Sequence, residues 1–181
     1  MELIKNLKEV SLAKNLFLAI VGTILLTISA KIKIPFWPVP MTMQTFVVLL
    51  LGVLYGWKLG LFTVSLYLLE GIAGLPVFAG TPEKGVGFIY FTGPTMGYLI
   101  GFLISVSLAG FFTFNNNFAK NFIKLIFSVS FIYILGLIWL GSLIGWDKPI
   151  FSLGAKPFLL AEIFKILLLT ILIPKIKKFR I

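Results

Sequence analysis

The sequence predicts an all-α integral membrane protein, a single domain over residues 1–181 built from six transmembrane helices. Composition is the first reason, because 59% of the 181 residues are hydrophobic and the mean hydropathy is +1.07. A soluble domain of this length has too little interior to bury so many apolar side chains, whereas a bilayer is itself an apolar solvent. Distribution is the second reason, because charged residues make up only 12% of the chain and cluster between apolar runs. Both features indicate several membrane spans.

The spans themselves are predicted from the lengths of these runs. A helix needs about 20 apolar residues to cross the hydrocarbon core, and we expect spans at residues 12–30, 42–55, 58–72, 94–114, 119–144 and 157–173. The first run ends at Lys31 and Lys33, which are followed by three prolines. It is too long for a signal-peptide core, so we expect it to be retained. The second and third runs are short, and residues 56–58 join them tightly.

The last three spans are bounded by residues typical of helix ends. The fourth run ends at three consecutive asparagines, residues 115–117, and the fifth begins shortly after them. The sixth begins near Pro157, whose missing N–H would lack an intrahelical partner in a first turn anyway. Pro174 and a basic tail are expected to stop it.

The basic residues predict the orientation in the membrane. With six spans both termini share one side. That side holds ten basic residues, namely Lys5, Lys8, Lys14, Lys58, Lys120, Lys124, Lys175, Lys177, Lys178 and Arg180, whereas the other side holds only five, namely Lys31, Lys33, Lys84, Lys148 and Lys156. Positive charge favours the cytoplasmic side. We therefore expect a multi-pass protein whose N- and C-termini are both cytoplasmic.

Residues 74–93 form an unusual connection between the third and fourth spans. The segment faces outward in this topology, yet it is too apolar for a solvated loop. Irregular backbone beside lipid must be buried in protein or line a cavity, because lipid offers no hydrogen-bond partners. We expect a re-entrant-like loop that folds back over the helices as a lid or wall. The alternative is a surface loop with a few exposed apolar residues.

Ionisable residues inside membrane spans usually mark a functional site, and the sequence offers three candidates of this kind. Glu162 and Lys165 are three residues apart on the sixth span, so they share one helix face. They lie roughly 7.5 Å and 12 Å below Pro157, in the outer half of the membrane. We interpret them as ligand-binding residues, and the alternative is an ion pair that satisfies itself within the bundle. Glu70, at the outer end of the third span, is a weaker candidate that could equally cap the following loop.

Other residues are candidates for hydrogen bonding or for docking. Gln44 and Tyr98 lie at the outer ends of spans and suit a small polar ligand, unless they serve as caps or interhelical contacts. Ala19, Thr23 and Thr27 form a stripe of small residues on the first span. Such a stripe permits close helix approach, either by a partner subunit or within this protein.

Missing residue types exclude several functions. The chain has no cysteine and no histidine, so we expect no disulfide and no metal site. It has no Ser-His-Asp set, no H-E-x-x-H motif and no phosphate-binding loop, so we expect neither an enzyme nor a bound cofactor. Its net charge of +10 comes without the base-stacking groups of a nucleic-acid-binding face. Uphill transport would need ATP hydrolysis by another chain.

Several motifs occur in a recognisable order. They are P-V-P-M-T-M-Q-T at 38–45, Y-L-L-E-G at 67–71, G-L-P-V-F-A-G at 74–80, G-P-T-M-G-Y-L-I-G-F at 93–102, W-L at 139–140, P-F at 157–158, and the acid and lysine of the sixth span. This order resembles the BioY family, the biotin-specific S components of energy-coupling factor (ECF) transporters of prokaryotic cell membranes. The resemblance covers nearly the whole chain and is most specific over residues 38–102.

The resemblance implies a six-helix S component that binds biotin on its outer side. A transmembrane coupling subunit and two cytoplasmic ATPase subunits would drive it. The implied binding residues are Glu162, Lys165, Gln44, Tyr98, Phe78, Ala79 and Gly80. Glu162, where the family usually has Asp, would accept from the ureido N–H groups or orient Lys165, and Lys165 would meet the carboxylate or a polar ring atom. Phe78, Ala79 and Gly80, in the loop between the third and fourth spans, would form a wall beside the ligand.

Three alternatives are left open by the sequence. The chain could be an S component for another small anionic vitamin or for a biotin precursor. It could be an intramembrane enzyme with Glu70 and Glu162 as an acid pair, which would require the two carboxylates to converge. It could also be a membrane scaffold with no ligand.

Overall fold

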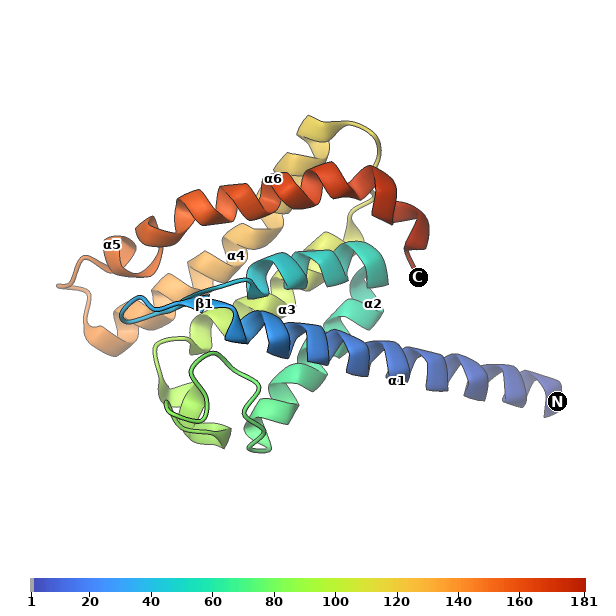
Figure 1. The fold of residues 1–181 in the computed structure, drawn as a ribbon, viewed down its shortest axis with the longest axis horizontal. Helices are drawn as coiled ribbons and strands as arrows, with labels where there is room; N and C mark the ends of the chain where they lie inside the picture. The colour runs from blue at the N-terminus through green and yellow to red at the C-terminus, as the bar shows by residue number, and fades with distance from the viewer. Residues whose placement is uncertain (1) are drawn as a thin grey trace.

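The computed structural model describes the backbone of residues 2–181 and the side chains of residues 12–181. It is a helical bundle (Figure 1) with the elements α1 (Glu2–Lys31), β1 (Lys33–Ile34), β2 (Met41–Thr42), α2 (Gln44–Ile72), the 3₁₀ turn η1 (Gly87–Thr92), α3 (Met96–Phe111), α4 (Phe118–Ile144), α5 (Ile150–Gly154), η2 (Lys156–Phe158), α6 (Leu159–Ile176) and η3 (Lys177–Phe179). The predicted helical class is confirmed, apart from a two-stranded antiparallel hairpin that the sequence did not reveal.

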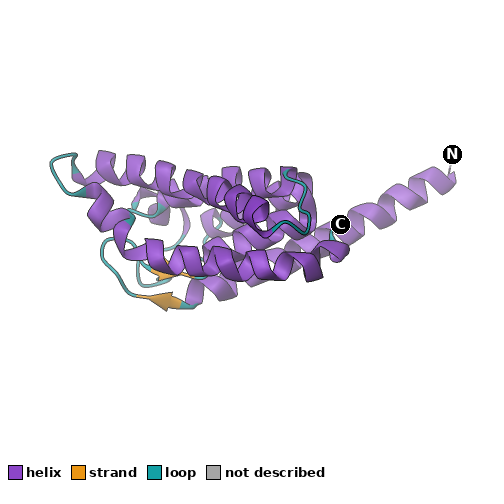
Figure 2. Cartoon of the chain, turned by 90° about the horizontal axis from the view of Figure 1, so that it is seen from above, coloured by secondary structure: helices purple, strands orange, loops and turns teal. Residues whose placement is uncertain are grey.

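Four helical stretches within the described residues are long and apolar enough to cross a membrane. They are Leu12–Lys31, Gln44–Ile72, Phe118–Ile144 and Ile150–Phe179, and α3 is apolar but shorter. The N-terminal part of α1 extends beyond the other helices (Figure 2), and both termini lie toward the same end of the molecule. The β1–β2 hairpin and the connection from α4 to α5 lie toward the opposite end (Figure 1).

The long helix α2 is bent at the junction predicted near residues 56–58. Gly56 has φ 70° and ψ 178°, a backbone conformation open almost only to glycine. The second arm of α2 therefore runs back from the first (Figure 1). Gly110 of α3 packs against this bend so closely that a Cβ there would collide with the backbone of Gly56 and Trp57. Two glycines thus bring the bend of α2 and the end of α3 together.

Several helix ends differ from the sequence prediction. Pro174 lies inside α6 and does not stop it, because a proline in the last turn removes only one intrahelical hydrogen bond. Pro157 lies in η2 rather than in the first turn of α6. The predicted start of the next helix just after residues 115–117 is confirmed, since Asn117 caps α4 by accepting a hydrogen bond from the N–H of Lys120 at 2.9 Å. The preceding helix α3 ends at Phe111, three residues before its predicted end.

The loop that follows α2 packs against protein. Phe78 is 1% exposed and contacts Tyr67 of α2 edge to face, with ring centroids 5.2 Å apart. It also stacks on Tyr90 of η1 at 4.8 Å. The Tyr67 hydroxyl donates to the carbonyl of Val77 at 2.9 Å. These contacts bury the middle of the loop and place it beside the start of α2, where the candidate site lies.

Candidate functional site

A buried ion pair on α6 is the centre of the candidate site. The side chains of Glu162 and Lys165 are both nearly inaccessible, at 3% and 6% residue exposure. Lys165 Nζ and Glu162 Oε2 are 3.0 Å apart. One helical turn therefore brings the two charges together, as their three-residue spacing predicts.

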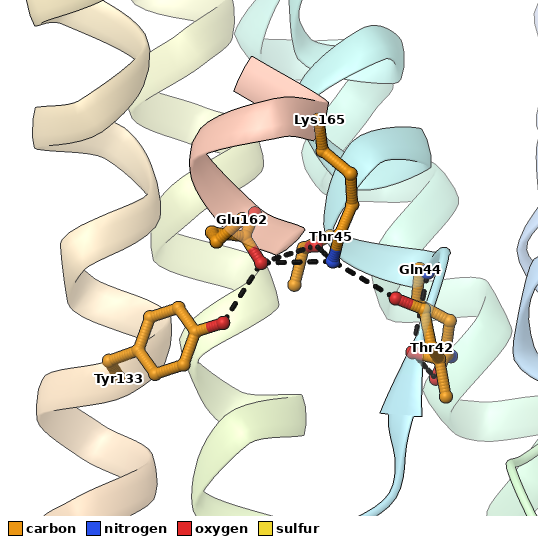
Figure 3. A network of polar contacts seen from close by, with 6 residues as sticks. All are labelled: Thr42, Gln44, Thr45, Tyr133, Glu162 and Lys165. Atoms are coloured by element: carbon orange, nitrogen blue, oxygen red, sulfur yellow. Dashed lines mark hydrogen bonds and ion pairs between the residues drawn. The ribbon is translucent and has the colours of Figure 1, made fainter. Parts of the chain in front are cut away.

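The ammonium of Lys165 connects α6 to the beginning of α2. Besides Glu162, it donates to the Thr45 hydroxyl at 2.7 Å and to the Thr42 carbonyl at 3.0 Å (Figure 3). An ammonium has three N–H donors, so each of them has an acceptor. The charge is held in place by β2 and α2 as well as by α6.

The two oxygens of the Glu162 carboxylate differ in their hydrogen bonding. Its Oε2 accepts from Lys165 and from the hydroxyls of Thr45 and Tyr133, each at 2.9 Å (Figure 3). Its Oε1 is buried and has no hydrogen-bond partner among the described residues. Buried polar atoms are seldom left unpaired, because the lost hydration is costly. Glu162 therefore retains the capacity to accept a further N–H or O–H donor.

The pair lies at the wall of a cavity between α2, α3, α4 and α6. The cavity volume is about 60 Å³, enough for a few water molecules. Its walls are largely apolar but include the hydrogen-bonded polar groups of α2, α4 and α6 described above. The lining residues are Val39, Pro40, Met41, Thr42, Gln44, Thr45, Ala79, Tyr90, Thr95, Tyr98, Leu99, Phe102, Ile132, Tyr133, Phe158, Glu162 and Lys165. Pockets that bind small organic ligands are usually larger than this.

Five of the seven predicted ligand-binding residues line this cavity: Gln44, Ala79, Tyr98, Glu162 and Lys165. The two neutral polar residues of this set, Gln44 and Tyr98, already have hydrogen-bond partners within the chain. The Gln44 amide Nε2 donates to the Tyr67 hydroxyl at 2.8 Å, and the Tyr98 hydroxyl donates to the Gly154 carbonyl at 2.8 Å. These side chains link the cavity to the loop and to α5.

Phe78 and Gly80 do not line the cavity, unlike the Ala79 that separates them. Phe78 is enclosed by Tyr67, Tyr90 and Phe91. Gly80 has a φ of 80°, which turns the backbone. The irregular backbone thus points neighbouring residues in different directions, so the expected wall formed by all three is reduced to Ala79.

Sequence reasoning missed Thr45 and Tyr133, which complete the polar network. Thr45 directly follows Gln44, and its position one residue into α2 was a usable signal. Tyr133 lies in the middle of an apolar helix, where a tyrosine is ordinarily interpreted as packing. Its hydroxyl reaches Glu162 only because α4 and α6 pack at this register.

The remaining candidates lie away from the cavity. Glu70 is half-buried and lines neither of the two cavities that Glu162 lines, so no convergence of the two acids is seen. Trp139 of α4 donates its indole N–H to the Gly93 carbonyl at 2.9 Å.

The small-residue stripe of α1 faces its own chain. Ala19 and Thr23 are 0% and 2% exposed, and the hydroxyls of Thr23 and Thr27 bond to carbonyls of α1 itself. Tyr55 of α2 donates to the Leu18 carbonyl at 3.0 Å on this side of α1. Two of the three residues are therefore enclosed by the chain itself, which favours the internal α1–α2 contact over docking of a partner subunit, whereas Thr27 is half-buried.

The fold and the site define a helical membrane protein with an internal cavity that is lined by apolar residues and by a buried ion pair. Comparison with known sequences is more specific. The chain belongs to the BioY family, whose sequence profile matches residues 4–180.

Similar proteins agree with this assignment. The chain is 36% identical over 158 residues to a probable biotin transporter BioY of Pyrococcus horikoshii, a match that covers 87% of this chain and 89% of the relative. It is 32% identical to the biotin transporter BioY of Thermotoga maritima, over 93% and 98% of the two chains. A crystal structure of the S-component for biotin from an ECF-type ABC transporter superposes with a TM-score of 0.77 at 28% identity, covering 93% of each chain.

Proposed function

We propose that this protein is the substrate-binding S component of an ECF-type ABC transporter and that its ligand is biotin. The observation that carries this proposal is the buried Glu162–Lys165 pair at the wall of the cavity, with Oε1 of Glu162 left without a donor. The names of the BioY relatives and of the superposed S component point to the same ligand.

Biotin matches the distribution of polar and apolar groups in the cavity. Its ureido ring carries two N–H donors and a carbonyl acceptor, which complement a carboxylate with a free oxygen and a nearby ammonium. Its sulfur-containing ring suits apolar walls such as Leu99, Phe102 and Phe158. Entry of the ligand would widen the cavity and replace some of the internal hydrogen bonds of Lys165. The hydrogen bond of Lys165 that biotin replaces would decide whether Lys165 contacts the ureido ring or the carboxylate.

The membrane topology that we propose has six spans, with both termini cytoplasmic. The bend at Gly56 would divide α2 into two spans, and an even number of spans agrees with both termini lying toward the same end of the bundle (Figure 1). Each arm of α2 is shorter than the about 20 residues of a full span. The β1–β2 hairpin and the loop of residues 73–95 would then fill the outer part of this cross-section, in the manner of a re-entrant loop.

Transport would depend on partner subunits. A binding cavity alone supplies no energy for uphill movement, and the chain carries no phosphate-binding loop. A transmembrane coupling subunit and two ATPase subunits of an ECF transporter would supply it. The protein itself would then act in capture and release of the ligand, without catalysing a reaction.

Calorimetric titration of biotin into the purified protein in detergent tests the proposal. We expect saturable binding at one site per chain, and a rise in the melting temperature as the ligand is added. Dethiobiotin, which keeps the ureido ring and the carboxylate but lacks sulfur, should compete more weakly than biotin. Tighter binding of dethiobiotin would assign the site to a biotin precursor, and no binding of either compound would refute the proposal.

A further inference from the structure

The last residue of α1, Lys31, is bound to the loop that follows α2. Its Nζ lies 2.7 Å from the carbonyl of Pro76, 3.1 Å from the carbonyl of Phe78, and 3.1 Å from both the carbonyl and the hydroxyl of Thr81. Within the described residues, no carboxylate forms an ion pair with it. Three N–H donors thus face four oxygens of one short segment, 45 to 50 residues away in the sequence.

The segment that Lys31 binds is also a wall of the cavity. Ala79 lines the cavity and lies between Phe78 and Thr81, whose carbonyls are bound by Lys31. The Ala79 carbonyl itself accepts from the Tyr90 hydroxyl at 2.8 Å, and Tyr90 is another lining residue. The position of this wall therefore depends on hydrogen bonds made by its backbone, and Lys31 supplies those that reach it from α1.

The other contacts of this wall come from inside the bundle. Tyr67 of α2 donates to the Val77 carbonyl, and Gln44 donates in turn to the Tyr67 hydroxyl. Lys31 differs from these groups because it approaches from outside the cavity and brings a positive charge. A hydrogen bond from a charged donor is stronger than one between neutral groups, so this is the contact whose removal should loosen the wall most.

We infer that Lys31 is a positioning residue, which ties the end of α1 to the cavity wall and so sets ligand affinity without touching the ligand. This inference rests on the proposed binding function. It explains why a lysine at the end of a membrane helix folds onto backbone carbonyls, whereas Lys33, two residues later, makes no side-chain hydrogen bond or ion pair to the described residues. It also makes the position of α1 a determinant of the shape of the cavity.

The test compares Lys31→Met with Lys33→Met, which removes the same charge from the exposed β1 strand. Biotin affinity is measured by calorimetry, and the order of the loop is measured without ligand as the rate at which trypsin cuts after Lys84, an exposed residue of the same loop. We expect Lys31→Met to weaken biotin binding at least about tenfold and to accelerate cleavage after Lys84. Lys33→Met should change neither.

A milder variant keeps the test interpretable should Lys31→Met fold poorly. Thr81→Val removes the one side-chain acceptor from the four oxygens, and we expect a smaller loss of affinity and a smaller gain in cleavage. Wild-type affinity and wild-type cleavage in Lys31→Met, or equal effects in Lys33→Met, would overturn the inference. If the wild-type protein does not bind biotin, the proposed function fails, and the cleavage rates still decide whether Lys31 holds the loop.

Discussion

Tyr133 of α4 donates its phenolic hydrogen to Oε2 of Glu162 on α6 across 2.9 Å, on the same oxygen that accepts from Lys165. This hydrogen bond joins two helices at the wall of the cavity. It also holds Oε2, which already accepts three hydrogen bonds, toward α4 and α2, so that Oε1 is the oxygen left to accept a further donor.

Removal of this hydroxyl by Tyr133→Phe should shift the carboxylate and weaken biotin binding. The loss of one hydrogen bond to a charged group corresponds to about 1.5–3 kcal/mol, or roughly a tenfold to hundredfold rise in Kd. Calorimetry on the purified variant measures it. Tyr55→Phe is the matched control, because the Tyr55 hydroxyl bonds to α1 and lines no part of the cavity; it should keep wild-type affinity. Equal affinity in both variants would contradict a role for Tyr133.

Ala79 and Phe78 are neighbours with opposite expected roles. Ala79→Val adds two methyl groups to the wall of a cavity of about 60 Å³, so it should weaken biotin binding with little change in melting temperature. Phe78→Ala instead removes the centre of an aromatic cluster and should destabilise the fold by about 3–5 kcal/mol. Thermal unfolding and calorimetry on both variants separate the effects. An unstable Ala79→Val with normal affinity would contradict the assignment of Ala79 to the cavity wall.

The sequence was sufficient where the governing interactions are local. The spacing of Glu162 and Lys165 places them on one helical face whatever else the chain does, and the glycine at the junction of two short apolar runs marked the bend of α2. Tyr133 and Thr45 were missed because their contact with Glu162 depends on the register in which α4 and α2 pack against α6. The stripe at Ala19, Thr23 and Thr27 indicated close packing correctly as a property of α1, but small residues do not specify which helix approaches them.

The bend of α2 offers a prediction that concerns the fold alone. Gly56→Ala has room for its methyl group but must adopt a positive φ, which costs about 1–3 kcal/mol. Gly110→Ala has an ordinary φ but would collide with the backbone at the bend, and overpacking of this kind costs about 1–3 kcal/mol. Since the two strains arise at one contact, the double variant should be less destabilised than the sum of the single variants. Unfolding midpoints of the three variants measure this, and strict additivity would argue against a shared contact.

The charged pair itself can be tested for function separately from structure. Glu162→Gln or Lys165→Met alone leaves one buried charge unpaired, which costs about 3–5 kcal/mol. The double variant Glu162→Gln/Lys165→Met removes both charges, so its melting temperature should recover toward that of the wild type. Biotin binding should not recover, because the groups that complement the ureido ring and carboxylate are gone, and we expect a loss of at least about tenfold. Neutralising the exposed Asp147–Lys148 pair, whose charges are 3.1 Å apart, should alter neither property, since solvated pairs contribute little. A stable double variant with wild-type affinity would show that the pair only holds the bundle together, and the ligand site would then have to lie elsewhere.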